Sequence, residues 1–143
     1  MRKGRGGSAE TRRKGASLVE FALVAFLCVI LLLSTVEFGR LLLVYNTVAN
    51  AAREGARYAS VSGTGGGTRA GRTPEEVAAE VRKFARAGPV DLTRLQISVG
   101  YPDGANAAGM RVDVTVEYPY DPLIGLLPLQ INLASTSRGV ITF

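Results

Sequence analysis

The feature that most constrains this chain is an apolar run from Phe21 to Val36, sixteen residues without a charged side chain. A basic cluster, Arg12-Arg13-Lys14, and a single carboxylate, Glu20, come just before it. Such a run is typical of a membrane-spanning helix. Because a carboxylate in lipid costs roughly 2.5–3.5 kcal/mol or more, we expect another group to compensate Glu20.

The excess of positive charge lies before this run. Of the 17 Lys and Arg residues, six fall within residues 1–15, where Glu10 is the only acidic residue, and the rest of the chain holds eleven of each sign. The basic isoelectric point therefore comes from the leader, and we expect no nucleic-acid binding. The same asymmetry predicts a cytoplasmic N-terminus and export of the chain from about Arg40 onward. A secretory signal is disfavoured, because the run is long for one and lacks a small-x-small cleavage site after it.

The chain lacks the residues of several common catalytic and metal sites. It has no histidine, and its one cysteine, Cys28, lies inside the apolar run. Zinc sites, His-dependent triads and an intrachain disulfide are therefore excluded. We expect no catalytic residue, no metal and no cofactor. A membrane-anchored hydrolase is the least favoured hypothesis, since the exported carboxylates are predicted mainly at strand ends and on polar strand faces: Asp91, Asp103, Asp113, Glu117 and Asp121.

The apolar run continues into a longer helical segment. From Ala16 to Ser60 there is no proline, and only Gly39 and Gly55 interrupt the helix-compatible sequence. One helix of this length measures about 68 Å against a hydrocarbon core of roughly 30 Å, so its second half must lie outside the lipid. We expect a leader at residues 1–15, a transmembrane helix at 16–38 and an extramembrane continuation at 39–62, with Gly63 ending the helix.

The outer half of this helix has a narrow face of small side chains. At steps of three and four residues it carries Tyr45, Val48, Ala49, Ala52, Ala56 and Ala59. Such spacing predicts an amphipathic helix against which another element packs closely.

The rest of the chain predicts a small exported α+β domain over residues 74–143, after a glycine-rich linker at 63–73. No Gly-Lys-Ser/Thr follows the glycines, so a phosphate loop is not expected. Thr73-Pro74-Glu75-Glu76 is a capping box with proline at the first helical position. It begins a short helix, ending at Gly88-Pro89, whose expected apolar face is Val77, Val81, Phe84 and Ala85.

Alternating apolar residues then predict a β-hairpin, with strands at 95–101 and 110–118. A third strand is expected around Leu129–Leu133, continuing toward Ile141. Three antiparallel strands need a cover for their apolar side, and the outer half of the long helix is the expected cover. The apolar loop Leu123–Leu127 either folds under this sheet or contacts a partner or the membrane surface.

Two sets of charged residues on the long helix are candidates for interactions. Glu37 and Arg40 are three residues apart and can pair at the far interface of the bilayer. The favoured interpretation is a surface pair that only marks this boundary and contributes less than about 1 kcal/mol. The set Arg53, Glu54 and Arg57 either docks the globular part or a partner subunit, or forms a solvated charged face.

Three stretches of the chain resemble the TadE-like pseudopilins of the bacterial tight-adherence (Flp) pilus and secretion system. Lys14–Val24 is similar to a prepilin-type processing site, and Val36–Arg40 and Asn50–Ala59 agree with the same family. The resemblance implies a pilin-like fold in the bacterial inner membrane. It also implies that a membrane aspartic prepilin peptidase cuts between Gly15 and Ala16, which makes Glu20 the fifth mature residue.

The resemblance suggests a partner for Glu20. In pilin-like assembly the new α-amino group of one subunit would meet the Glu20 carboxylate of its neighbour. At about 4 Å and an effective dielectric near 20 this attraction is worth roughly 4 kcal/mol, comparable to the cost of keeping the carboxylate in lipid. The alternative is that Glu20 sits at the membrane edge, held by the N-terminus of its own helix.

These observations favour a TadE-like minor pseudopilin or assembly component of a Tad-type pilus or secretion system, and not an enzyme. Its expected partners are the membrane, the prepilin peptidase and other pilus or pseudopilin subunits. The alternative is an uncleaved single-pass membrane protein with an exported binding domain.

Overall fold

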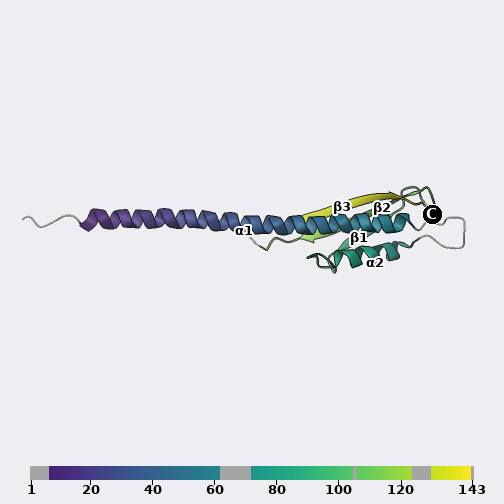
Figure 1. The fold of residues 1–143 in the computed structure, drawn as a ribbon, viewed down its shortest axis with the longest axis horizontal. Helices are drawn as coiled ribbons and strands as arrows, with labels where there is room; N and C mark the ends of the chain where they lie inside the picture. The colour runs from purple at the N-terminus through teal and green to yellow at the C-terminus, as the bar shows by residue number, and fades with distance from the viewer. Residues whose placement is uncertain (1–6, 62–71, 105, 124–129, 143) are drawn as a thin grey trace, which may run out of the picture. The chain divides into compact units, whose positions relative to one another are not determined.

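The computed structural model describes residues 7–61, 72–104, 106–123 and 130–142, of which 7–14 are described by their backbone alone. In chain order the elements are α1 (Gly7–Ser60), α2 (Pro74–Ala85), β1 (Gln96–Gly100), β2 (Arg111–Tyr120) and β3 (Ile131–Val140) (Figure 1). The α+β class is confirmed, with its long N-terminal helix, short second helix and three-stranded antiparallel sheet. The chain divides after Phe38 into two units, Met1–Phe38 and Gly39–Phe143.

Both ends of α1 differ from the sequence expectation. The helix begins at Gly7, nine residues before Ala16, because the intervening segment has no proline and is rich in good helix formers. It ends at Ser60, whose carbonyl oxygen accepts hydrogen bonds from the Thr142 backbone N–H (2.9 Å) and side chain (3.1 Å). The end of the chain thus satisfies one of the last carbonyls of the helix. The expected stop, Gly63, lies outside the described residues.

The three strands form one antiparallel sheet in the order β1-β2-β3. On β2 every second side chain is buried, which gives one strand face to the core: Val112, Val114, Val116, Tyr118 and Tyr120. The other face carries polar pairs with β3, including Asp113 with Arg138 and Thr115 with Thr136. The predicted alternation is therefore confirmed in the central strand.

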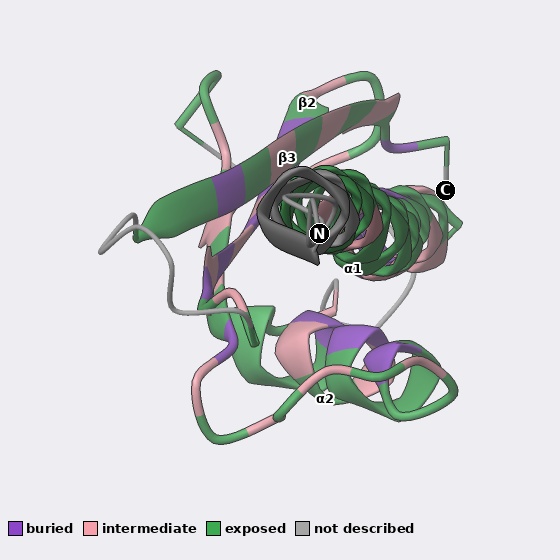
Figure 2. Cartoon of the chain, turned by 90° about the vertical axis from the view of Figure 1, so that its left-hand side faces the viewer, coloured by how far each residue is buried: buried purple, intermediate pink, exposed green. Residues whose placement is uncertain are grey.

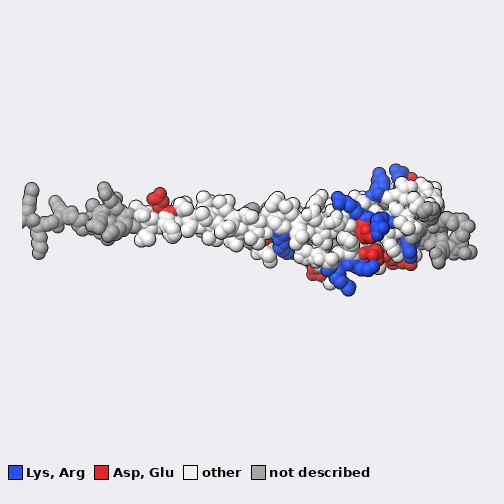
Figure 3. All heavy atoms as spheres, viewed as in Figure 1, with Lys and Arg blue, Asp and Glu red and all other residues white. Residues whose placement is uncertain are grey.

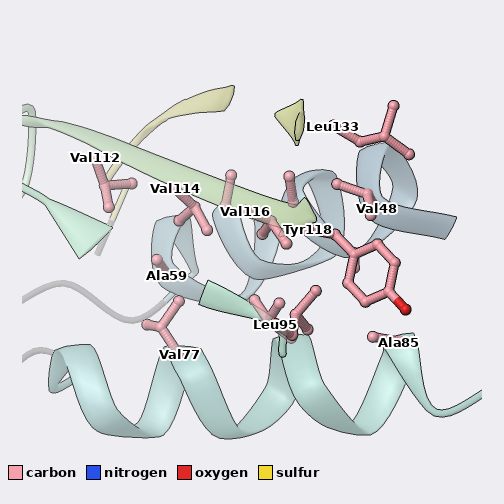
Figure 4. Packing of buried hydrophobic residues seen from close by; sticks show 14 of the residues in the cluster. Val48, Ala59, Val77, Ala85, Leu95, Val112, Val114, Val116, Tyr118 and Leu133 are labelled. Carbon is pink, nitrogen blue, oxygen red and sulfur yellow. The ribbon is translucent and has the colours of Figure 1, made fainter. Parts of the chain in front are cut away.

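The core lies where α1, α2 and the sheet meet. Viewed along its axis, the outer half of α1 runs between the sheet and α2 (Figure 2). The close view shows Val77 and Ala85 of α2 and Val114 and Val116 of β2 in one apolar cluster with α1 (Figure 4). From α1 the cluster takes Val44, Val48, Ala51, Ala52, Ala56 and Ala59. The outer half of α1 therefore covers the sheet, as the sequence predicts.

Glycine makes this close packing possible. A Cβ atom on Gly55 of α1 would clash with Val81 of α2 and would lie 3.1 Å from Cγ1 of Val114 on β2. On β3, a Cβ atom on Gly139 would clash with Ser60 and lie 3.2 Å from the carbonyl oxygen of Ala56. At these points neighbouring elements approach α1 more closely than any larger residue allows.

Two residues assigned to apolar faces prove to be exposed. Tyr45 is 46% exposed, and Val44 takes the core position beside it. Phe84 is 42% exposed. The buried face of α2 repeats every four residues, at Val77, Val81 and Ala85, and Phe84 lies at the edge of this face. The capping box at Thr73 and Glu76 is confirmed, and α2 ends at Ala85, before the expected Gly88.

The packing at Gly55 predicts a destabilising substitution. Gly55→Val should lower the free energy of unfolding by roughly 1–3 kcal/mol, because the added methyl groups must displace Val81 and Val114. The measurement is thermal unfolding of the full chain in detergent. Gly39→Val is the matched control on the same helix, since a Cβ atom there meets nothing within 4 Å. Equal unfolding temperatures for the two variants would contradict the role given to Gly55.

Candidate functional site

The predicted processing segment lies on an open part of α1. Gly15 and Ala16 are helical, and a Cβ atom on Gly15 would meet nothing within 4 Å. The residues from Ala16 to Glu20 are all exposed. Ala16 and Glu20 are four residues apart and so share one helix face. An amino group at Ala16 would therefore lie one turn from Glu20 of the same chain, on an exposed face of the helix.

Among the described residues, nothing in its own unit covers the apolar run behind this segment. The run and the residues next to it carry large exposed apolar side chains, from Leu18 to Phe38. The space-filling view shows the resulting uncharged stretch along α1 (Figure 3). In the described residues α1 is the one helix long and apolar enough to cross a membrane, with a mean hydropathy of 2.7 over its best window. Apolar surface of this extent requires lipid or other helices around it.

Polar side chains inside the run are compatible with lipid. The hydroxyls of Ser34 and Thr35 each donate to the carbonyl oxygen four residues earlier, at 2.8 Å. These bonds satisfy hydroxyl donors that find no water in a bilayer core. Cys28 is exposed and has no disulfide.

Beyond the run, Arg40 is tied to the end of β2. Its Nη1 atom donates to the carbonyl oxygen of Asp121 at 3.2 Å, and its guanidinium lies 4.9 Å from the centre of the Tyr120 ring. Both Glu37 and Arg40 are half-buried. Arg40 therefore has a structural role that its spacing from Glu37 did not reveal.

The second charged set lies on the outer half of α1. Arg57 donates twice to Glu54, from Nε at 3.0 Å and from Nη2 at 2.5 Å, which lowers the pKa of Glu54. The Arg53 guanidinium donates to the Asn50 side chain at 3.1 Å. The side chains of Arg53 and Arg57 are exposed, and these contacts stay within one helix. Such exposed pairs contribute little to stability, so this set remains available as a surface for a partner.

The carboxylates that a hydrolase would need have structural partners. Hydrogen bonds from the Nε and Nη2 atoms of Arg111, and one from its backbone N–H, hold the pKa of Asp103 at about 2. The other four candidates bond to neighbouring side chains: Asp91 to Thr93, Asp113 to Arg138, Glu117 to Asn132 and Asp121 to Arg94. Within the described ranges no group of three or more His, Cys, Asp and Glu side chains is placed to hold a metal ion.

One cluster was missed by sequence reasoning. Arg94 forms an ion pair with Asp121 at 2.7 Å, and its guanidinium lies 5.9 Å from the centre of the Tyr118 ring. Together with Arg40 and Tyr120, these residues join α1, the segment before β1 and the end of β2. The sequence signal for this cluster is the Tyr-Pro-Tyr-Asp stretch that begins at Tyr118. The contact with Arg40 has no local signal, because Arg40 lies 80 residues before Tyr120.

Comparison with known proteins agrees with the geometry of α1. Residues 15–57 match the model of the TadE-like protein family. The match begins at Gly15 and covers the apolar run and most of the outer half of α1, so the resemblance noted in the sequence is confirmed over this TadE-like segment. The matched segment is similar to TadE-like proteins, and it includes the one described stretch of helix that is long and apolar enough to cross a membrane. No curated protein and no solved structure matches the chain.

The contacts of Arg40 predict a measurable contribution to stability. Arg40→Ala should lower the free energy of unfolding by about 1 kcal/mol, because it removes the contact with the Tyr120 ring and the bond to Asp121. Arg53→Ala on the same helix is the control, and it should change the free energy of unfolding by less than about 0.5 kcal/mol. Chemical unfolding of the full chain in detergent measures both, and an equal loss in the two variants would argue against the Arg40 contact.

Proposed function

We propose that this chain is a TadE-like minor pseudopilin, or an assembly component, of a Tad-type pilus or secretion system. It is anchored in the bacterial inner membrane by α1, with its N-terminus in the cytoplasm and residues from about Arg40 onward exported. The observation that carries the proposal is the family match, which begins at Gly15 and runs through the exposed apolar part of α1. The role is structural and interactive, with other pilus or pseudopilin subunits as partners.

The proposal includes processing by a prepilin peptidase between Gly15 and Ala16. The open space that a Cβ atom on Gly15 would meet among the described residues supports this, because a protease needs close access to the backbone at its cut site. Cleavage removes six of the basic side chains and leaves equal numbers of acidic and basic side chains in the mature chain. It also creates an α-amino group for the Glu20 carboxylate of a neighbouring subunit. That pairing would offset the cost of a carboxylate in lipid.

The processing step is tested at Gly15. Gly15→Leu should block cleavage, because the side chain obstructs the approach of the peptidase, while the fold tolerates it in open space. Mass spectrometry of the N-terminus, in cells with and without the peptidase, measures cleavage. Gly39→Leu, also in open space on α1, is the matched control and should be cleaved normally. An intact Met1 in the unmodified protein, or a start beyond Val36, would overturn the pseudopilin proposal and favour the uncleaved single-pass alternative.

The role of Glu20 is tested separately. Glu20→Ala should leave membrane insertion intact or improved, since it removes a charge from the edge of the apolar run. It should lower incorporation into the assembly, because the amino group of the neighbour loses its partner. Co-purification with the other pilus subunits measures incorporation, and Ser17→Ala, at another exposed position of the same helix, is the control. Undiminished incorporation of Glu20→Ala would show that the carboxylate has no pairing role.

A further inference from the structure

Helix α2 runs beside the outer half of α1 in the opposite direction. A Cβ atom on Gly55 of α1 would clash with Val81 of α2, and a Cβ atom on Gly88, just after α2, would clash with Thr47 of α1. The chain therefore moves back along α1 as α2 advances. Glu80, which precedes Val81, lies near the level of Gly55.

At this level α1 presents a basic surface. Arg53 and Arg57 stand on either side of Gly55 in the sequence, are both exposed and lie four residues apart, so they share one face of the helix. In the part of the chain that the structure describes, the side chains they bond to belong to α1 itself: Asn50 for Arg53 and Glu54 for Arg57. Because a guanidinium group has five N–H donors, both arginines keep donors for a partner outside the chain.

Helix α2 presents an acidic stripe beside these arginines. Glu76, Glu80 and Phe84 recur at steps of four residues and so share one face of α2. The pKa of Arg57 is raised mainly by its bond with Glu54, and the charge of Glu80 raises it further. The acidic stripe therefore lies on the side of α2 that is next to the basic surface of α1.

Phe84 is the apolar part of this surface. Its side chain is 42% exposed, whereas Val81 and Ala85 beside it are fully buried. Exposed aromatic side chains are enriched in the contact surfaces between proteins. All these residues belong to the unit Gly39–Phe143. We use the name two-helix face for the set Arg53, Arg57, Glu76, Glu80 and Phe84.

We infer that two copies of this chain associate through the two-helix face, with α1 of each copy opposite α2 of the other. A half-turn about an axis parallel to α1 keeps every residue at its level along the helix. It therefore brings the arginines of each copy to the carboxylates of its neighbour, so that the same contact forms twice. The parallel direction of the two copies rests on the proposed function, because helices anchored in one membrane by the same end point the same way.

The distribution of charge selects a second copy as the partner. The two-helix face holds two arginines on α1 and two glutamates on α2, so two such faces do not repel each other by net charge. A partner with one sign of charge would attract one helix and repel the other. A second copy turned by a half-turn attracts both helices, and it covers Phe84 at the same time.

An exchange of charges tests the inference. Arg53→Glu and Glu80→Arg each place like charges opposite one another twice in a dimer, so each variant alone should self-associate roughly fivefold or more weakly than the unmodified chain. An equimolar mixture of the two variants should recover the association. One half of the mixed dimer then has the native pair, and the other half has the same pair with its charges exchanged. Charges that act only within one chain would give no such recovery.

The measurement uses full-length chains with two different affinity tags. They are mixed in detergent at low salt, and the amount of one chain captured with the other is measured over a dilution series. Arg82→Glu is the matched control, because it makes the same change of charge at an exposed position of α2. Arg82 is two residues from both Glu80 and Phe84, so it does not share their face, and its variant should associate like the unmodified chain. Circular dichroism checks that the helical content of each variant is unchanged.

Three outcomes would overturn the inference. In the first, all variants associate equally, which would assign the contact to another part of the chain. In the second, the unmodified chain is a monomer, and in the third, the equimolar mixture associates no better than its components. Cleavage at Gly15 is measured separately, so each of these outcomes leaves the test of the proposed function unaffected.

Discussion

The close approach of three elements at Gly55 is the constraint on which the unit Gly39–Phe143 depends. At this residue α1 meets Val81 of α2 and Val114 of β2 without a side chain between them. The alanines of α1 extend the same narrow face along the helix, and Gly139 of β3 meets it from the sheet. A sheet of three strands and a helix of three turns have little apolar surface of their own. They form a core only because both can pack against α1 at short distance.

This arrangement gives α1 two different surroundings along one continuous helix. Its outer half buries small residues against protein, while its apolar run exposes large ones. The two halves need different partners, which explains why small side chains and bulky leucines are separated along the chain. In the proposed function, the exposed half would anchor the chain in lipid and carry Glu20, while the packed half forms the core of the unit Gly39–Phe143.

The charged residues beyond the apolar run have distinct structural roles. Arg40 bridges α1 and the end of β2, whereas the contacts of Arg57 with Glu54 and of Arg53 with Asn50 remain within α1. The candidate carboxylates mostly stabilise turns and strand pairing, as Asp103 does through Arg111 and Asp113 through Arg138. The unit Gly39–Phe143 thus uses several of its charges to hold its own elements together, while Arg53 and Arg57 stay exposed on α1.

The helices and strands could be predicted from the amino-acid sequence, because their signals are local. The apolar run, the capping box at Thr73 and the alternation along β2 depend on residues a few positions apart, and they correctly predicted the long helix, the short helix and the antiparallel strands. The TadE-like segment was also recognisable from such local stretches. Which side chains are buried and which charges meet depends instead on contacts between residues far apart in the sequence. Val44 rather than Tyr45 lies in the core because the sheet and α2 select the face of α1, and Arg40 meets Tyr120 because folding brings together residues 80 positions apart.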